Sequence, residues 1–333
     1  MRIAVDTLGG DHAPHEILKG VAIALRDGGF TPEELLLVGP ESIIREQLGA
    51  EGITDLPAIV HTEQVIEGHE KPVVGLRTKP EASISLCVQA IRKGEADGLI
   101  AFGNTGATVA ASTMGLGMLP GIRRPGIAVT ILGPGGRFVL LDAGANPTPK
   151  PEHLFQYSLM GEAYARDLFG REQPRIGLMN IGGEAGKGSE VIRAAYQTLE
   201  ESDLNFVGNV EGNELFADKA DVLVADGFVG NMVLKVVEGF AEYLVHSATS
   251  GNDAEDSGVR KVLRTMLGAS DFSEVGGATL LGVNGVVLIG HGRSHASAVL
   301  PALSAVRADI EAGVNHHIVE SLASHGGEVT SNP

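Results

Sequence analysis

The segment RIAVDTLGGDHAPHE, residues 2–16, contains the pattern that decides the fold. All residues between Arg2 and Asp6 are apolar, which is typical of a strand buried on both faces of a sheet. A turn with two adjacent glycines follows. Pro14 then precedes a run with helical spacing, and proline fits the first turn of a helix. The segment therefore predicts a strand, a turn and a helix in succession.

The same succession recurs along almost the whole chain. The predicted strands are 2–6, 34–39, 58–62, 97–103, 127–132, 137–144, 175–182, 204–210, 221–227 and 286–292. The predicted helices are 15–27, 41–49, 81–94, 105–117, 151–169, 189–202, 231–248 and 296–325. This alternation is typical of a mainly parallel sheet covered by helices. We predict a three-layer αβα fold, with a single α/β catalytic domain over 1–325 and a flexible tail at 326–333.

Five of the strand-to-helix turns are rich in glycine and polar residues: DTLGGDHAPHE, FGNTGATVA, LDAGANPTPKPEH, NIGGEAGKGSE and ADGFVGNMV. Turns at the carboxyl ends of parallel strands meet at one edge of a sheet, where ligands bind. Helix N-termini there attract anions. Any one of these turns could be plain punctuation of the chain. Five of them together favour one binding crevice.

The turn NIGGEAGKGSE, residues 180–190, resembles a nucleotide-binding loop but has the wrong spacing. A P-loop needs a hydroxyl residue directly after its lysine. Here Gly188 follows Lys187, and Ser189 comes one residue late. The spacing argues against ATP and leaves binding of another anion open. A surface ion pair of Lys187 with a nearby glutamate is the simpler alternative.

Composition excludes several classes of function. A formal net charge of −17 is unsuited to nucleic-acid binding, which needs clustered cations. The single cysteine, Cys87, excludes an internal disulfide. No signal peptide and no run of about 20 apolar residues is seen, so we expect a cytoplasmic protein. The absence of G-x-G-x-x-G weakens a dinucleotide-binding interpretation. No metal-ligand spacing stands out, and we expect neither metal nor cofactor.

The polar residues of these turns suggest chemistry without a covalent nucleophile. Asp11 or His12 could act as acid or base, while Asp11 could equally cap the following helix. Asn104 and Thr105 could donate to an oxyanion or cap a helix, or do both. The later turns contribute Asp142, Asn146, Lys150, His153, Lys187, Asp226 and Asn231. Such donors suit a reaction in which a bound anion is itself the nucleophile.

Several blocks together resemble the phosphate:acyl-acyl-carrier-protein acyltransferases (the PlsX family). They include MRIAVDTLGGDHAP, GNTGAT, LLDAGANPTPKPEHLFQYSLMG, PRIGLMNIGGEAGKGSE, DVLVADGFVGNMVLKVVEG and GGATLLGVNGVVLIGHG, in order along the chain. The resemblance implies a dimeric cytoplasmic enzyme that converts long-chain acyl carrier protein and phosphate into acyl phosphate for phospholipid synthesis. It also implies a fold akin to phosphotransacetylases and isopropylmalate-type dehydrogenases.

The resemblance carries over to individual positions. Lys187, Asn104, His12 and Asn231 match family blocks, and the resemblance makes Lys187 a candidate for activating phosphate or the thioester. We predict catalytic roles for these four residues: Lys187 and the Asn104–Thr105 amides hold phosphate, Asn104 or Asn231 stabilises the oxyanion, and a nearby acid such as His12 protonates the leaving thiol. The implied substrate-binding residues are Gly10, Asp11, Gly103, Thr105, Gly106, Asp142, Asn146, Lys150, His153, Asp226, Gly227 and Gly230. The segment after His291, GRSHASAV, departs from the family pattern, so its residues receive no role.

The expected partners are acyl carrier protein and a second copy of the chain. A helical protrusion is expected around 240–275, at the dimer tip. Within it, SGVRKVLRTMLGAS (257–270) has an apolar stripe opposite cations, a pattern that fits either a membrane-surface helix or packing in the dimer. Peripheral association with the membrane, and with a membrane glycerol-phosphate acyltransferase, would follow from the first alternative.

Three other functions stay open at this stage. An enzyme of the same fold could use acyl-CoA in place of the carrier protein. An NAD-dependent dehydrogenase could occupy a related scaffold. A non-catalytic adaptor could bind the membrane or the carrier protein without turnover.

Overall fold

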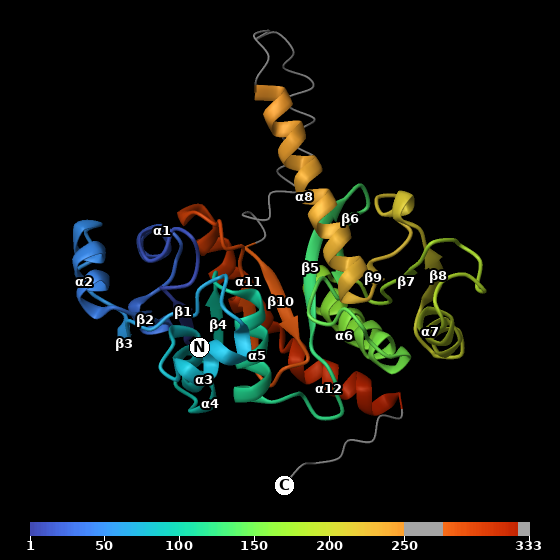
Figure 1. The fold of residues 1–333 in the computed structure, drawn as a ribbon, viewed down its shortest axis with the longest axis horizontal. Coiled ribbons are helices and arrows are strands. Elements are labelled where there is room, and N and C mark those ends of the chain that lie inside the picture. Colours follow the sequence, from blue (N-terminus) through green and yellow to red (C-terminus); the bar gives the residue numbers. More distant parts are fainter. Residues whose placement is uncertain (250–275, 326–333) are drawn as a thin grey trace. The chain divides into compact units, whose positions relative to one another are not determined.

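The computed structural model describes residues 1–249 and 276–325 (Figure 1). Contacts within the chain divide it into two compact units. Unit 1 contains residues 1–125 and 276–319 of the described chain, and unit 2 contains 126–249 and 320–325. Each unit is an α/β structure with mainly parallel strands, which confirms the predicted fold class. The single catalytic domain stays a prediction.

In unit 1 the strands follow the order β3-β2-β1-β4-β11-β10. They are β1 (Ile3–Asp6), β2 (Leu35–Gly39), β3 (Ala58–His61), β4 (Gly98–Ala101), β10 (Ala278–Leu281) and β11 (Val286–Ile289). Its helices are α1 (His15–Arg26), α2 (Glu41–Ala50), α3 (Pro72–Thr78), α4 (Ser83–Arg92), α5 (Thr105–Leu116) and α11 (Val299–Ala312). Only the β10–β11 pair is antiparallel among the pairs given for this unit.

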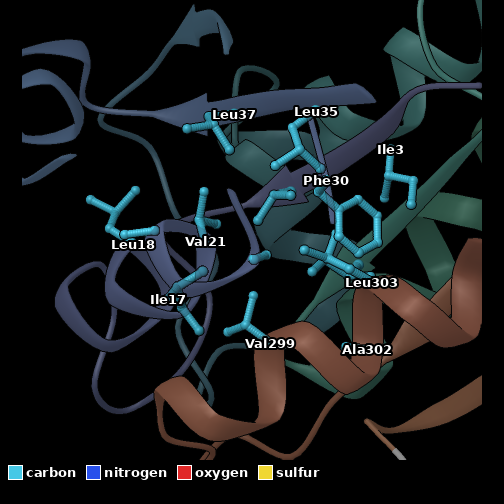
Figure 2. Close-up of a cluster of buried hydrophobic side chains, with 14 of the residues drawn as sticks. Ile3, Ile17, Leu18, Val21, Phe30, Leu35, Leu37, Val299, Ala302 and Leu303 are labelled. Carbon is cyan, nitrogen blue, oxygen red and sulfur yellow. The ribbon is translucent and has the colours of Figure 1, made fainter. Parts of the chain in front are cut away.

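Figure 2 shows part of the apolar core of unit 1, where buried side chains pack helices α1 and α11 against the sheet. Ile3 and Val5 of β1 pack with α1 and α11, through side chains such as Ile17, Val21 and Val299, all buried. Alternate residues of a strand face opposite sides of the sheet, so Ala4 and Asp6 face the other way. Helix α4 packs against β1 and brings Ser83 beside Asp6. Unit 1 thus has helices on both faces of its sheet.

In unit 2 the strands follow the order β5-β6-β9-β7-β8. They are β5 (Gly126–Gly133), β6 (Gly136–Leu141), β7 (Ile176–Met179), β8 (Phe206–Val210) and β9 (Val222–Val224). The helices are α6 (Pro151–Phe169), α7 (Glu190–Glu200) and α8 (Gly227–Thr249). Strands β6, β9, β7 and β8 are mutually parallel, and only β5 runs against its neighbour β6.

Each predicted strand is present, although most are shorter than predicted, and several helices and one strand differ from prediction. The short strand β10 and the helix α3 were not predicted. The expected helix 296–325 is two helices, α11 and α12 (Val314–Ser324), because Gly313 adopts a left-handed conformation with φ of 66°. Helix α8 begins at Gly227, earlier than the predicted 231. The division between the two units falls inside α12.

Candidate active site

Asp6 organises the first glycine turn in unit 1. It ends β1, is 3% exposed, and its Oδ1 accepts hydrogen bonds from Leu8 N at 3.0 Å and Gly9 N at 3.1 Å. Burial raises the pKa of Asp6, although these two N–H groups and the Ser83 hydroxyl beside it favour the charged form. The buried carboxylate therefore stabilises the turn by accepting two of its N–H groups and does not face solvent.

The first turn lies against the turn that follows β4. A Cβ atom added to Gly9 would come within 2.8 Å of Gly103 N, so both positions need glycine for close backbone contact. Gly10 has φ of 112°, and an added Cβ there would lie 3.2 Å from the carbonyl oxygens of Gly292 and Phe102. The turns after the parallel neighbours β1, β4 and β11 thus meet at one edge of unit 1, as predicted for parallel strands.

Asp11 and His12 lie exposed at the end of this turn. The predicted cap is wrong: α1 begins at His15 after Pro14, and no side chain caps it. Asp11 N instead donates to Gly292 O at 2.8 Å. The His12 ring stacks on the His295 ring, with centroids 4.5 Å apart and planes 16° from parallel. No metal-binding group of three or more His, Cys, Asp or Glu occurs in residues 1–249 and 276–325.

Asn104 caps α5 and holds a neighbouring loop. Its Oδ1 accepts from Ala107 N at 3.0 Å. Its amide Nδ2 donates to the carbonyl oxygens of Glu67, Gly68 and Glu70, at 3.0, 3.3 and 3.1 Å. The capping alternative is therefore observed. The oxyanion role stays a prediction that requires this amide to exchange partners. Thr105 and Gly106 form the first turn of α5, with Gly106 against Pro72.

Asp142 plays the corresponding part in unit 2. It follows β6, is fully buried, and accepts four backbone N–H bonds, from Ile127, Gly144, Ala145 and Asn146, at 2.9, 3.0, 2.9 and 2.6 Å. Burial raises the pKa of Asp142 against the effect of these donors. The turn 143–146 is wrapped around this one carboxyl group.

The start of α8 packs onto the Asp142 turn. A Cβ atom on Gly227 would lie 2.7 Å from Asp142 Oδ2, and one on Gly230 would meet the Asp142 carbonyl oxygen at 1.9 Å. Asp226 caps the helix by accepting from Val229 N at 2.8 Å. Asn231 is exposed, and its amide lies over Gly144, with 3.6 Å between Nδ2 and the position of a Cβ atom there. Gly144 has φ of 144°.

Lys150 and His153 form the start of α6, after the same turn. Lys150 N donates to His153 Nδ1 at 3.0 Å, so this buried histidine closes the first turn of the helix. The Lys150 ammonium is exposed, 3.9 Å from Glu152 Oε1. Asn146 Nδ2 donates to Tyr157 OH at 2.7 Å. These contacts fix the turn 142–153 as one piece, and the substrate-binding roles of its residues stay predictions.

Lys187 lies in the loop that follows β7. Asn180 Nδ2 donates to Lys187 O at 3.1 Å, and Asn209 Nδ2 donates to Glu184 O at 2.9 Å, so amides from the ends of β7 and β8 brace the loop. The Lys187 side chain passes over buried Gly182, 3.0 Å from the position of a Cβ atom there. Its ammonium is exposed and, across the described residues, has no carboxylate within 4.0 Å. The expected surface ion pair is absent there.

The predicted residues therefore fall into one group in each unit. In unit 1 the turns after β1, β4 and β11 bring together Gly10, Asp11, His12, Gly103 and Asn104. In unit 2 the loops after the parallel neighbours β6, β9 and β7 share one edge of the sheet and contain Asp142, Asn231 and Lys187. Sheet order places the ends of these strands within about 10 Å of one another, because neighbouring strands lie about 4.8 Å apart. Lys187 lies eight residues beyond the end of β7, so its closeness to Asn231 stays a prediction. A single crevice that joins both units stays a prediction.

Sequence patterns missed two features of these groups. Asp6 was predicted as the last residue of strand 2–6 and Asp142 within strand 137–144, and nothing in the local pattern shows that each folds a turn. His295 lies in the segment to which no role was given. The membrane-surface helix expected at 257–270 lies outside the described residues. None of the helices in the described part of the chain is both long and apolar enough to span a bilayer.

Comparison with known proteins places the chain. A model of the family described as "Fatty acid synthesis protein" matches residues 1–317. The chain is 43% identical to the phosphate acyltransferase of Pelotomaculum thermopropionicum over 332 residues, covering 97% of this chain and 96% of the relative. It is 42% identical to the phosphate acyltransferase of Shouchella clausii over 335 residues, covering 98% and 100%.

Solved structures with low sequence identity share the fold. A branched-chain phosphotransacylase from Enterococcus faecalis V583 superposes with a TM-score of 0.62 at 16% identity, covering 93% of this chain and 99% of its own. A phosphotransacetylase from Streptococcus pyogenes gives 0.61 at 16% identity, covering 93% and 94%. A 4-hydroxythreonine-4-phosphate dehydrogenase from Klebsiella pneumoniae gives 0.53 at 11% identity, covering 96% and 99%. The family model and the close relatives span nearly the whole sequence, so this chain belongs to the fatty acid synthesis protein family, which confirms the resemblance to the PlsX family predicted from its motifs.

Proposed function

We propose that this acyltransferase moves a long-chain acyl group from acyl carrier protein to inorganic phosphate and releases acyl phosphate for phospholipid synthesis. Relatives named phosphate acyltransferase, about as long as this chain, support acyl transfer to phosphate. The observation that carries the proposal is the exposed Lys187 ammonium. It lies on a braced loop at one edge of unit 2 and forms no ion pair within 4.0 Å in the described chain, although the Glu184 carboxylate lies near its side chain at Gly182. Such a cation suits an anionic substrate.

The reaction needs no protein nucleophile. A phosphate oxygen attacks the thioester carbonyl carbon, an oxygen–carbon bond forms, and the carbon–sulfur bond breaks. The proton of hydrogen phosphate ends on the departing sulfur, so atoms and charge balance without a cofactor. In this proposal Lys187 holds phosphate, and Asn231 stabilises the carbonyl oxygen as it gains charge. The Asn231 amide is suited to this role because it is exposed and no hydrogen bond within the described chain occupies it.

The test is to trap the product. The protein is incubated with palmitoyl carrier protein and phosphate, and acyl phosphate is captured with hydroxylamine as the hydroxamate. We expect hydroxamate and free carrier protein in equal amounts, both dependent on phosphate. Omission of phosphate is the control. Release of the carrier protein without hydroxamate, or no release at all, would contradict the proposal.

The same assay separates the alternatives. An enzyme that prefers acyl-CoA would show a higher kcat/KM with palmitoyl-CoA than with palmitoyl carrier protein. A non-catalytic adaptor would bind the carrier protein and give no product. An NAD-dependent dehydrogenase would bind NAD(H) in a titration, whereas we expect a flat titration. The similarity of this chain to the 4-hydroxythreonine-4-phosphate dehydrogenase, at 11% identity, concerns the fold alone.

We further propose that α8 pairs with α8 of a second copy of the chain. Figure 1 shows α8 extending past the strands of unit 2, and none of its described side chains from Asn231 to Ala241 is buried. An exposed apolar face runs along it, with 54 to 64% exposure at each of Phe228, Met232, Val236, Phe240 and Tyr243. The spacing of Met232, Val236, Gly239 and Tyr243 by four, three and four residues is that of paired helices.

Two observations favour a protein helix over a lipid surface as the occupant. Gly239 interrupts the apolar face and has open space around it, which suits close approach of another backbone and is otherwise costly within a helix. The net charge of −17 opposes binding to anionic lipid. We expect a dimer by light scattering, and a monomer for Val236→Lys combined with Phe240→Lys. Phe216→Lys, which changes an exposed aromatic residue elsewhere in unit 2, is the control. An unchanged dimer in the double variant would contradict this surface.

A further inference from the structure

His295 lies in the segment after His291, to which the sequence pattern gave no role. It is in direct contact with His12, the candidate acid. Its ring stacks on the ring of His12 with centroids 4.5 Å apart and an angle of 16° between planes. Aromatic rings at this separation attract each other in stacked geometries. Both residues belong to unit 1, one after β1 and the other after β11. The stack therefore fixes the direction in which the exposed His12 ring points.

Glu16 fixes His295 in turn. One oxygen of this carboxylate, Oε2, accepts from Ala296 N at 2.9 Å and lies 3.5 Å from His295 Nδ1. The Ala296 N–H bond is the largest of the causes that lower the pKa of Glu16, so the carboxylate stays charged. Glu16 thus holds both the backbone and the ring of the His295 segment.

A backbone bond ties the same two segments together. Asp11 N donates to Gly292 O at 2.8 Å, one residue before His12 and three before His295. Gly10 adds a second restraint, because its Cα is packed against Gly292 O and Phe102 O. The main-chain bond therefore joins the two segments, and the ring stack is the contact that reaches the His12 ring, from a His295 that the Glu16 carboxylate holds. An exposed histidine on a loop would otherwise sample several rotamers.

We propose that His295, held by Glu16, is a positioning residue that aims His12 at the leaving sulfur. This inference rests on the proposed acyl transfer to phosphate. In the step concerned, a phosphate oxygen attacks the carbonyl carbon and the carbon–sulfur bond breaks. The proton that hydrogen phosphate releases reaches the departing sulfur through the His12 ring. His295 touches neither reactant and takes no proton; it restricts the ring that does.

The test compares two donors that differ in their need for this proton. Palmitoyl carrier protein releases an alkyl thiolate, which is basic and benefits from protonation. Palmitoyl thiophenyl ester releases an aryl thiolate, a much weaker base that can depart unprotonated. Rates of hydroxamate formation are measured with both donors for His12→Ala, His295→Ala and His295→Phe. His15→Ala is the matched control, because His15 opens the same helix and pairs with Gln47 instead.

We expect His295→Ala to lower kcat with the carrier protein about tenfold, a part of the roughly 10²–10⁴-fold that a positioned acid contributes, and to change the thiophenyl rate less than about threefold. His12→Ala should show the same selectivity with a larger loss. His295→Phe keeps a stacking ring and should recover most of the rate. His15→Ala should match the wild type with both donors.

Three results would overturn the inference. Equal losses of His295→Ala with both donors would show a merely structural role. Wild-type rates for His295→Ala would remove the residue from the mechanism. A His12→Ala variant without donor selectivity would remove the proton carrier itself. Failure of the wild-type protein to form acyl phosphate from either donor would instead reject the proposed function, and this inference with it.

Discussion

The turns at Asp6 in unit 1 and Asp142 in unit 2 are folded in the same way, by a buried carboxylate, but lie beside different candidate groups. Each aspartate is a buried carboxylate at the end of a central strand that folds a glycine turn by accepting its N–H groups. Asp6 accepts two N–H groups of its turn, and Asp142 accepts three of its turn and a fourth from Ile127 on the neighbouring strand β5. The unit 1 turn leads to a titratable pair, His12 and His295, whereas the unit 2 edge presents a free amide and a free ammonium, on Asn231 and Lys187.

The comparison separates the residues that fold the turns from the residues that are proposed to react. Both carboxylates are buried and accept hydrogen bonds from backbone N–H groups, most of them in their own turns. The candidate groups lie elsewhere on the same edges: His12 follows the Asp6 turn, Asn231 packs over the Asp142 turn, and Lys187 lies on a loop that Asn180 and Asn209 hold. In the proposed reaction, unit 1 handles the proton and unit 2 holds the anion. The following predictions test how far the parallel extends.

The largest effect should distinguish the two carboxylates. Asp142→Ala leaves four N–H groups without their acceptor, three in its turn and one at Ile127 of β5, and Asp6→Ala leaves two. An unsatisfied buried donor costs about 1–3 kcal/mol, so with partial relaxation we expect losses of about 4 and about 2 kcal/mol in the free energy of unfolding. Urea unfolding measures both. Asp142→Asn retains an acceptor oxygen and should cost less than the alanine variant. Equal losses for Asp6→Ala and Asp142→Ala would remove the distinction.

Helix packing on the Asp142 turn gives the next effect. Gly230 and Gly49 both lie within helices, where alanine is intrinsically better by about 1 kcal/mol. An added Cβ atom meets the Asp142 carbonyl at 1.9 Å in Gly230→Ala and nothing within 4 Å in Gly49→Ala. We expect the first variant to lose about 3 kcal/mol and the second to gain up to about 1 kcal/mol. A stable Gly230→Ala protein would show that α8 does not rest on this turn.

A third buried carboxylate, Asp309 of α11, sharpens the comparison because it has no turn to fold. Its Oδ2 accepts from the Thr279 hydroxyl at 3.0 Å, and burial raises the pKa of Asp309 to about 7 from 3.8. The folded state therefore holds a proton that the unfolded state has lost. Its contribution to stability is complete below pH 3.8 and disappears as the pH rises through 7.

We expect stability to fall from pH 5 to pH 8 by at most about 2–3 kcal/mol through this group. Urea unfolding of wild type and Asp309→Asn at both pH values isolates the effect, since the asparagine variant keeps every other titrating group. The difference between the two proteins should change with pH. A constant difference would show that Asp309 is ionised in the folded protein at both pH values.

The smallest effect concerns Asn104, where one side chain has two tasks. Asn104→Ala removes the cap of α5 and should cost about 1 kcal/mol. Asn104→Asp retains the capping oxygen but cannot donate to the three carbonyls of the 67–70 loop. We expect proteolysis within 67–70 to rise in both variants, while thermal unfolding shifts more for alanine. A protected loop in Asn104→Asp would show that these amide bonds do not restrain it.

Local signals in the sequence predicted much of the fold. Helix α6 was predicted with its observed bounds because Pro151 opens it and Gly170, with φ of 66°, closes it. The strands followed from short apolar runs. Strand β10 escaped notice because it is brief and follows two glycines. The break at Gly313 was missed because the apolar pattern continues across it.

The candidate site was predicted as residue types and not as contacts. Glycines and amides in the turns after strands were recognisable, and sheet order brings those of one unit together. The partners of Asp142 and His295 were not predictable, because Ile127 lies on a neighbouring strand and His12 at the other end of the chain. Asn104 shows the same limit: its pattern allowed a cap and an oxyanion donor, and only coordinates show the loop that occupies its amide.

The most direct measurement is the dependence of acyl phosphate formation on phosphate concentration in Lys187→Ala. Because the free ammonium in unit 2 is proposed to hold the nucleophile, kcat/KM for phosphate should fall more than about tenfold while KM for the carrier protein and the unfolding temperature stay near wild-type values. Lys219→Ala, which removes an ion-paired lysine of the same unit, is the control. Wild-type kcat/KM for phosphate in Lys187→Ala would contradict the account.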